Sequence, residues 1–238
     1  MSPAPAPRWP LGLPTRLRPV GLLGRGSSAA VWRALDADSG TEVAVKVLDG
    51  PAVRHEQEAR ALGRLRGVPG VCAVHELGRT PDGVAWMVLD LASGGTLADR
   101  VPLAPDDAVQ VWRSTAGTLS AVHELELCHG DVTPSNVLLD ELDRPLLADF
   151  GLAGLGPAGA TQPPAGLTPA FAAPERLQGA APSPASDVFA LAATLRACLA
   201  DEPSGALAEL LERCSDARPR SRPTAAELCG ELDARGRR

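Results

Sequence analysis

The chain has 238 residues, enough for one large domain or for two small lobes that each bury a core. Its hydrophobic content of 45% is typical of a globular domain, and no apolar run approaches the roughly 18 residues of a membrane helix. A net charge of −6, with no basic cluster except the terminal RGRR, argues against nucleic acid as a partner. The five cysteines are odd in number and lack CxxC spacing, so we expect reduced thiols, a cytoplasmic location and no membrane contact.

The composition is biased against residues with A/T-rich codons. The chain has no isoleucine and no tyrosine, and Lys46 and Asn136 are its only lysine and its only asparagine. We infer a GC-rich genome, in which a dispensable lysine drifts to arginine and a dispensable asparagine to serine or aspartate. The two survivors are therefore candidates for functional residues.

The N-terminal part of the chain has the pattern of a small sheet. Residues 1–12 are rich in proline and are predicted to form a disordered tail. Short apolar runs broken by Gly and Asp predict a meander of strands over residues 16–48. Residues 54–66 change to helical spacing, and the strand-like runs VCAVHEL and VAWMVLDL follow around the turn TPDG. Residues 13–91 are thus predicted to form a sheet that carries one helix.

The rest of the chain, residues 92–234, is predicted to be mainly helical. A long helix is expected to open at Pro105, since proline is favoured in a first helical turn. A Gly/Pro-rich loop is predicted over residues 152–169, and Ser186 is predicted to cap a strongly apolar helix behind it. Residues 235–238 are expected to be a C-terminal tail.

Two stretches of the N-terminal part are typical of phosphate binding. The run GLLGRGSSAAV contains Gly24 and Gly26, and glycine lets backbone N–H groups approach a phosphate closely. Such a pattern alone is more often a hairpin turn. Lys46 follows in the strand-like run VAVK, where its compact ammonium can bridge phosphate oxygens. A strand lysine is usually a surface charge, but the codon bias weakens that interpretation because arginine would serve a surface equally well.

Three oxygen-bearing side chains cluster further along the chain. Asp131 and Asn136 lie in HGDVTPSN, and Asp149 lies in LADFG. A carboxylate and a carboxamide that converge on one point suit Mg²⁺, and a second carboxylate nearby can accept a proton from a hydroxyl nucleophile. Isolated acidic residues are normally solvated, but the apolar runs VLL and PLLA around these three favour a site.

Together these motifs resemble those of the eukaryotic-type (Hanks-type) serine/threonine protein kinases that are common in GC-rich bacteria. GRGSSAAV is similar to the Gly-rich loop, VAVK to the strand lysine, HGDVTPSN to the catalytic loop and DFG to the metal-binding segment. APE, SDVFAL and RPTAAEL are similar to later family motifs, so the resemblance covers residues 16–232. It implies an α+β, bilobal fold with a small antiparallel N-lobe sheet, one N-lobe helix and a mainly helical, shortened C-lobe.

The resemblance also implies ATP and Mg²⁺ as cofactors and transfer to serine or threonine hydroxyls of a protein substrate, including the kinase itself. It implies Asp131 as the catalytic base and assigns the remaining catalytic positions to Lys46, Thr133 and Thr168. The implied metal ligands are Asn136 and Asp149. The nucleotide-binding residues that it implies are Leu23, Gly24, Gly26, Val31, Ala44, Lys46, Glu58, Asp90, Leu91, Ala92 and Leu138.

Some of these residues have more specific implied roles. Lys46 would hold the α- and β-phosphates and pair with Glu58, with Glu56 as the alternative partner. Val31, Ala44 and Leu138 would line the adenine site, and residues 90–92 would form the hinge between the lobes. A further pair, Glu175 with Arg222, would be structural.

The sequence departs from the family pattern in three places. Gly130 replaces the arginine of the His-Arg-Asp motif, so we expect activity that does not depend on phosphorylation of the activation loop. Thr133 replaces a lysine, so we expect turnover below the roughly 1 to 100 per second usual for kinases. The stretch between Asp187 and Arg222 is short, which predicts a trimmed C-lobe. Thr168 matches the family threonine that favours serine and threonine over tyrosine as acceptors.

Two alternative functions stay open. A pseudokinase scaffold that binds nucleotide weakly or not at all is favoured by Thr133, Ala29 and the trimmed C-lobe, and the retained Lys46 opposes it. A small-molecule phosphotransferase of the aminoglycoside-kinase type shares HGD with an asparagine after it, but DFG, APE and SDVFAL point away from that class. No sensor segment or membrane anchor is visible, so we also expect a regulatory protein partner.

Overall fold

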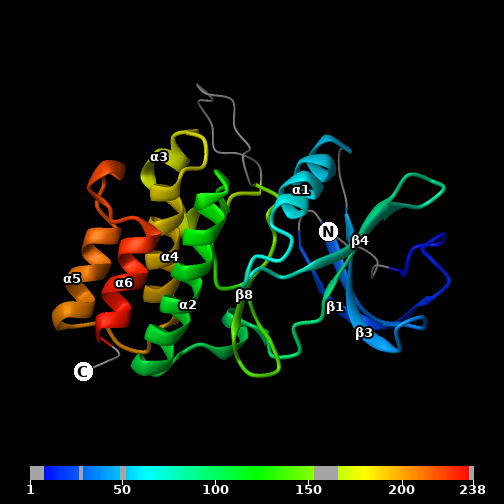
Figure 1. Ribbon diagram of the computed structural model, residues 1–238, viewed down its shortest axis with the longest axis horizontal. Coiled ribbons are helices and arrows are strands. Elements are labelled where there is room, and N and C mark those ends of the chain that lie inside the picture. The colour runs from blue at the N-terminus through cyan, green and yellow to red at the C-terminus, as the bar shows by residue number, and fades with distance from the viewer. Residues whose placement is uncertain (1–7, 27–28, 49–51, 153–165, 236–238) are drawn as a thin grey trace, which may run out of the picture.

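The computed structural model describes residues 8–26, 29–48, 52–152 and 166–235, without the side chains of residues 52–57 and 235. Most of the predicted N-terminal tail, the C-terminal end and most of the predicted loop over residues 152–169 lie outside the described residues. The sheet-rich part of the chain lies at one end of the long axis and the helices at the other, with the chain crossing between them (Figure 1).

The N-lobe is a five-stranded antiparallel sheet with strand order β1-β2-β3-β5-β4. Its strands are β1 (Leu17–Arg25), β2 (Ala29–Asp36), β3 (Thr41–Leu48), β4 (Val74–Arg79) and β5 (Ala85–Asp90). One helix, α1 (Ala52–Arg64), follows β3. The central strand β3 is buried over its last six residues, as its nearly continuous apolar run dictates. The predicted sheet with one helix is confirmed.

Three of the four tryptophans in the chain pack on one face of this sheet. Trp32 and Trp86 pack there among small apolar side chains, and Trp9 joins them from the N-terminal segment. The Trp9 and Trp32 rings meet edge to face, with centroids 5.7 Å apart. Trp9 therefore packs the described end of the predicted tail against the sheet, while Leu11 stays exposed.

The C-lobe combines a small three-stranded sheet on the side of the N-lobe with helices (Figure 1). The small sheet contains β6 (Gly95–Thr96), β7 (Val137–Leu139) and β8 (Pro145–Leu147). The α-helices are α2 (Pro105–Glu124), α3 (Pro174–Leu177), α4 (Pro184–Cys198), α5 (Gly205–Cys214) and α6 (Ala225–Arg235). Short 3-10 helices are η1 (Leu97–Arg100), η2 (Pro169–Phe171) and η3 (Pro219–Ser221). Helices α2 and α4 lie at the centre of this lobe, with α5 and α6 outside them (Figure 1).

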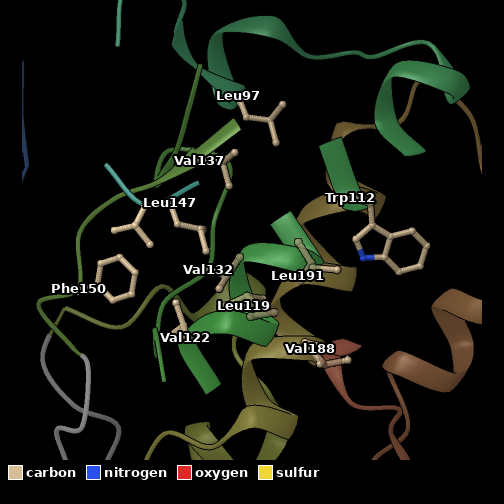
Figure 2. Close-up of a cluster of buried hydrophobic side chains, with 14 of the residues drawn as sticks. Leu97, Trp112, Leu119, Val122, Val132, Val137, Leu147, Phe150, Val188 and Leu191 are labelled. Atoms are coloured by element: carbon tan, nitrogen blue, oxygen red, sulfur yellow. The ribbon is translucent and has the colours of Figure 1, made fainter. Parts of the chain in front are cut away.

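The core of the C-lobe joins the two central helices to the segment that holds the predicted catalytic residues. Figure 2 shows Trp112, Leu119 and Val122 of α2 near Val188 and Leu191 of α4. The segment with the predicted site contributes further buried side chains to the same cluster, namely Val132, Val137, Leu147 and Phe150. The polar residues of this segment are therefore fixed by apolar neighbours packed on rigid helices.

The structure corrects one predicted helix start and bears on two other expectations. Helix α4 begins at Pro184 with Ser183 as its cap, and Ser186 instead bonds back to the N–H of Ser183 as the second half of a capping box. Between α4 and α6, where every residue is described, α5 is the only α-helix, as expected for a trimmed lobe. Among the described residues, no helix has the length and apolar composition to cross a membrane.

The predicted structural ion pair joins α3 to the start of α6. Arg222, whose side chain is fully buried, donates from Nη1 to Glu175 Oε1 over 2.6 Å and from Nη2 to Oε2 over 2.9 Å. Its remaining donors reach the carbonyls of Asp216 and Ala185, and its guanidinium lies over the Phe189 ring. The pair thus ties α3 to the segment between η3 and the last helix, α6.

Glu175→Gln is expected to lower the free energy of unfolding by about 3 kcal/mol, because it removes the charge that balances a buried guanidinium. Urea denaturation at pH 7 measures this change. The matched control is Glu231→Gln, which breaks a similar two-bond pair with Arg213 at the surface. That loss should stay below about 1 kcal/mol. Equal losses in the two variants would contradict the prediction.

The same pair predicts how stability depends on pH. Burial alone would raise the pKa of the Glu175 carboxyl, but the hydrogen bonds and charge of Arg222 outweigh it and hold that pKa below its usual value. The pair therefore stabilises the fold above the ordinary glutamate pKa of about 4.3, and this contribution fades as pH falls through the lowered pKa. The stability difference between wild type and Glu175→Gln should shrink in this acidic range.

Candidate active site

The lone lysine lies in a buried ion pair between the sheet and helix α1. Lys46 Nζ lies 2.6 Å from Glu58 Oε1, and the side chains are 9% and 7% exposed. The predicted partner is therefore in place, while the side chain of the alternative, Glu56, lies outside the described residues. Asp149 reaches the same ammonium from the C-lobe, with its Oδ1 3.0 Å from Nζ.

Lys46 and Asp149 shift each other's pKa. Burial alone would lower the pKa of Lys46, but the carboxylates of Asp149 and Glu58 outweigh it, and the pKa is raised. Burial would likewise raise the pKa of Asp149, but the charge and hydrogen bond of Lys46 outweigh it and the pKa is lowered. The site therefore holds a charged ammonium and a charged carboxylate side by side.

Asp149 is held in an unusual backbone conformation. Its φ is +64°, in the left-handed region that residues with a side chain seldom adopt. The next residue, Phe150, is fully buried in the C-lobe core and anchors the segment (Figure 2). The Asp149 carboxylate is 42% exposed, and Lys46 and the Gly151 N–H contact only its Oδ1. The second oxygen is therefore left for a cation.

The loop that contains His129, Gly130 and Asp131, called the catalytic loop below, is anchored by Asp187 of α4. This carboxylate accepts the His129 N–H over 2.8 Å and the Gly130 N–H over 2.9 Å, and His123 Nε2 lies 3.0 Å from it. His129 Nε2 lies 2.8 Å from the Ala148 carbonyl, which joins the loop to the segment of Asp149. Gly130 has a φ of +85°, and a Cβ there would meet the Leu152 carbonyl oxygen at 2.9 Å. Glycine is needed at this position by conformation and by space.

A group of metal-ligand types also occurs at this anchor. The ligand atoms of His123, Cys128 and Asp187 all lie within 4.8 Å of one another. Both Asp187 oxygens already accept backbone N–H groups, and burial raises the pKa of the Cys128 thiol to about 12. We therefore assign the group a structural role.

Asp131 meets its predicted neighbours directly. Thr168 donates to its two oxygens, from N–H over 3.0 Å and from Oγ1 over 3.1 Å. Asn136 Nδ2 donates to the Asp131 carbonyl over 2.8 Å and lies 3.3 Å from its carboxylate. Burial raises the pKa of the Asp131 carboxyl and outweighs the opposing hydrogen bonds from Thr168. A carboxylate oriented in this way and less acidic than usual suits proton acceptance from a hydroxyl.

The donor set fits Mg²⁺. Because Asn136 uses its amide nitrogen on Asp131, its amide oxygen is left for another partner. Asp149 offers its second carboxylate oxygen, and the Ala148 N–H donates to the Asn136 backbone carbonyl over 2.9 Å, which holds the two segments side by side. Carboxylate and carboxamide oxygens are ligands that Mg²⁺ takes together with phosphate.

The predicted phosphate-binding and adenine-binding residues surround Lys46 on the sheet. Val31 lies opposite Gly24 on one side and opposite Lys46 on the other, and Ala44 points to the same face of β3 as Lys46. No atom lies within 4 Å of a Cβ built at Gly24 or Gly26, so the space beside both glycines is open. Residues 27–28 of this loop lie outside the described residues.

The other predicted residues lie around the crossing between the lobes. Leu138 is half-buried in β7, and Leu23 is 52% exposed in β1. Asp90 ends β5, so residues 90–92 do connect the lobes. The Asp90 carboxylate, however, turns to β4, where it accepts the Ala73 N–H and lies 2.7 Å from His75 Nε2. The Asp90 side chain is therefore engaged within the N-lobe.

Thr133 is 4% exposed, and its carbonyl accepts the N–H groups of Asn136 and Val137. Its backbone therefore shapes the loop, and its assignment to the catalytic group stays a prediction.

Sequence reasoning missed the anchoring role of Asp187, although the SDVFAL motif contains it. It also missed Arg176, a buried arginine directly after the APE motif, for which no sequence pattern gave a signal.

Lys46 is paired with Glu58 in the N-lobe, and Asp131, Asn136 and Asp149 belong to the C-lobe. This arrangement defines a two-lobed phosphotransferase of the protein-kinase type. Comparison with known proteins agrees: a family model described as "Protein kinase domain" matches residues 17–204. The chain belongs to this family. The match ends before α5, so the last two α-helices lie beyond it.

Several curated relatives are bacterial serine/threonine-protein kinases. The chain is 36% identical to PknK of Mycobacterium tuberculosis over 185 residues, which are 73% of this chain and 16% of PknK. It is 36% identical to the DNA damage-responsive kinase RqkA of Deinococcus radiodurans over 190 residues, 74% of this chain and 28% of RqkA. PknL of M. tuberculosis is 35% identical over 180 residues, 70% of this chain and 44% of PknL. The chain thus matches less than half of the length of each relative.

Proposed function

We propose that this chain is a serine/threonine protein kinase that transfers the γ-phosphoryl group of ATP, with Mg²⁺, to protein hydroxyls. The observation that carries the proposal is the contact of Lys46 with both Glu58 and Asp149, 2.6 and 3.0 Å away, which joins the lobes at one cleft. Within this proposal, residues 13–91 act as the N-lobe and residues 92–234 as the C-lobe.

Each side chain has a task in the proposed reaction. When bound, ATP would supply the γ-phosphoryl group and leave as ADP, and Mg²⁺ would neutralise much of the phosphate charge. Lys46 binds phosphate oxygens, while Asn136 and Asp149 hold the metal. Asp131 orients the acceptor hydroxyl and takes its proton, and Thr168 fixes the Asp131 carboxylate through the two hydrogen bonds described above.

A pseudokinase is the second candidate, favoured by the burial of Thr133 where the family has a lysine. Against it, Lys46, Glu58, Asp131, Asn136 and Asp149 are all retained, and Lys46 contacts both Glu58 and Asp149. The protein substrate and any regulatory partner stay predictions, since the chain matches only part of each relative.

An assay with γ-labelled ATP tests the proposal. The purified chain is incubated with Mg²⁺ or with EDTA and offered itself, casein or an aminoglycoside as acceptor. We expect Mg²⁺-dependent label on protein. The chain contains no tyrosine, so acid-stable label on itself must lie on serine or threonine. ATP binding without transfer would support the pseudokinase, and label on the aminoglycoside alone would support a small-molecule phosphotransferase.

A further inference from the structure

A charged side chain is buried behind the catalytic loop without enough partners. Arg176 of α3 is 2% exposed, and its Nη1 donates to the Ala180 carbonyl. Its Nε and Nη2 are buried with no hydrogen-bond partner among the described residues. Unpaired buried donors are costly, and more so on a charged group, so these two N–H groups need an explanation.

Arg176 lines a small cavity beside Gly130 and Asp131 of the catalytic loop. The cavity is lined by Gly130, Asp131, Val132, Leu167, Phe171, Ala172, Ala173, Arg176, Ser186 and Ala190. Its volume of about 10 Å³ suits one water molecule and no larger ligand. The lining includes the polar side chains of Asp131, Arg176 and Ser186, and polar partners are the condition for a buried water to be held.

The position of this guanidinium matters because Gly130 has no side chain. Gly130 stands where the family motif has an arginine, so the loop lacks that cation of its own. The carboxylate charges of Asp187, Asp131 and Glu175 act on Arg176, although burial is the larger effect and lowers the pKa of its guanidinium. Arg176 is the only basic residue lining the cavity.

We propose that Arg176 is a positioning residue of the catalytic loop, which it holds at Gly130 and Asp131 through its buried guanidinium and one water molecule in the cavity. This inference rests on the proposed kinase activity. The fixed guanidinium takes the place of a cation on the loop and needs no phosphate to complete it. This explains how the loop can keep its shape with glycine at position 130.

The test uses the full chain with Arg176→Met and Arg176→Lys, under saturating and varied ATP. Arg176→Met is expected to lower kcat about tenfold, because the acceptor site shifts. The KM for ATP should stay unchanged, because Lys46, Glu58 and Asp149 do not touch Arg176. Arg176→Lys should recover most of kcat, since an ammonium keeps the charge and can reach the same water. The concentration of folded protein is set by titrating the ATP site, so a loss of folded molecules does not count as a loss of kcat.

A crystal structure of the wild type supplies the second readout, in which one ordered water should contact Arg176 Nε or Nη2. An unchanged kcat per ATP site in Arg176→Met, or an empty cavity, would overturn the inference and leave the proposed function standing. If Arg176→Met lowered kcat and ATP affinity together and Arg176→Lys restored neither, Arg176 would have a merely structural role. That result would also overturn the inference. A wild type without any transfer overturns both proposals.

Discussion

Asp149→Asn is expected to reduce phosphoryl transfer at least about 1000-fold, a loss of about 4 kcal/mol of transition-state stabilisation. The substitution keeps the shape of the side chain and one carbonyl oxygen, but it removes the charge that the metal needs. It also removes the carboxylate that lies 3.0 Å from the Lys46 ammonium. The measurement is initial-rate transfer from γ-labelled ATP at several Mg²⁺ concentrations.

The control for this prediction is Asp201→Asn, the same chemical change at an exposed residue between α4 and α5. It should transfer as the wild type does. Thermal melting of both variants separates a lost metal ligand from a lost fold, because Lys46 keeps its partner Glu58 in either case. Retention of more than a tenth of the wild-type rate by Asp149→Asn would remove Asp149 from the metal site.

Lys46→Arg is expected to lower kcat/KM for ATP at least about 100-fold, although the charge is kept. The ammonium is packed between Glu58 and Asp149 in a pocket where the side chain is 9% exposed. A planar guanidinium is larger and its donors are fixed in a fork, so it cannot contact both carboxylates and a phosphate as Lys46 does. Lys46→Met, which removes the charge as well, is the comparison. Equal activity of wild type and Lys46→Arg would show that charge alone is sufficient.

The single lysine also permits a test that needs no turnover. An acyl-phosphate derivative of ATP transfers its acyl group to an amine near the bound phosphates. Since Lys46 is the only lysine, the expected product is one modified peptide besides any reaction at the amino terminus. Excess MgATP should prevent this reaction, and Lys46→Arg should give no such peptide. Modification that MgATP fails to reduce would place Lys46 outside the nucleotide site.

The sequence predicted the groups that do chemistry better than the groups that hold them. Lys46, Glu58 and Asp149 meet as expected, because codon bias marked Lys46 and the resemblance to the kinase family implied all three. Asp131, Asn136 and Thr168 also lie together, although their roles stay predictions. The sheet-rich N-terminal part and the helical C-terminal part were predictable as well, because the sequence changes from strand to helical periodicity between them.

The supporting groups could not be predicted, because their role depends on contacts between segments far apart in the chain. Asp187 anchors His129 and Gly130 from 58 and 57 residues away. Arg176 looks like any exposed helix arginine until the fold buries it. The helix start at Ser183 was missed for a simpler reason, since Ser186 is also a good cap residue and only the backbone conformation distinguishes them.

The uneven placement of the indole rings gives each lobe its own optical signal. The chain has four tryptophans and no tyrosine, so all of its aromatic emission above 300 nm comes from indole. Trp9, Trp32 and Trp86 lie on the N-lobe sheet, while Trp112 is buried between the C-lobe helices. Replacement of Trp112 by phenylalanine would leave a fluorescence spectrum that reports on the N-lobe alone. Changes that nucleotide binding causes in the N-lobe could then be followed without any label.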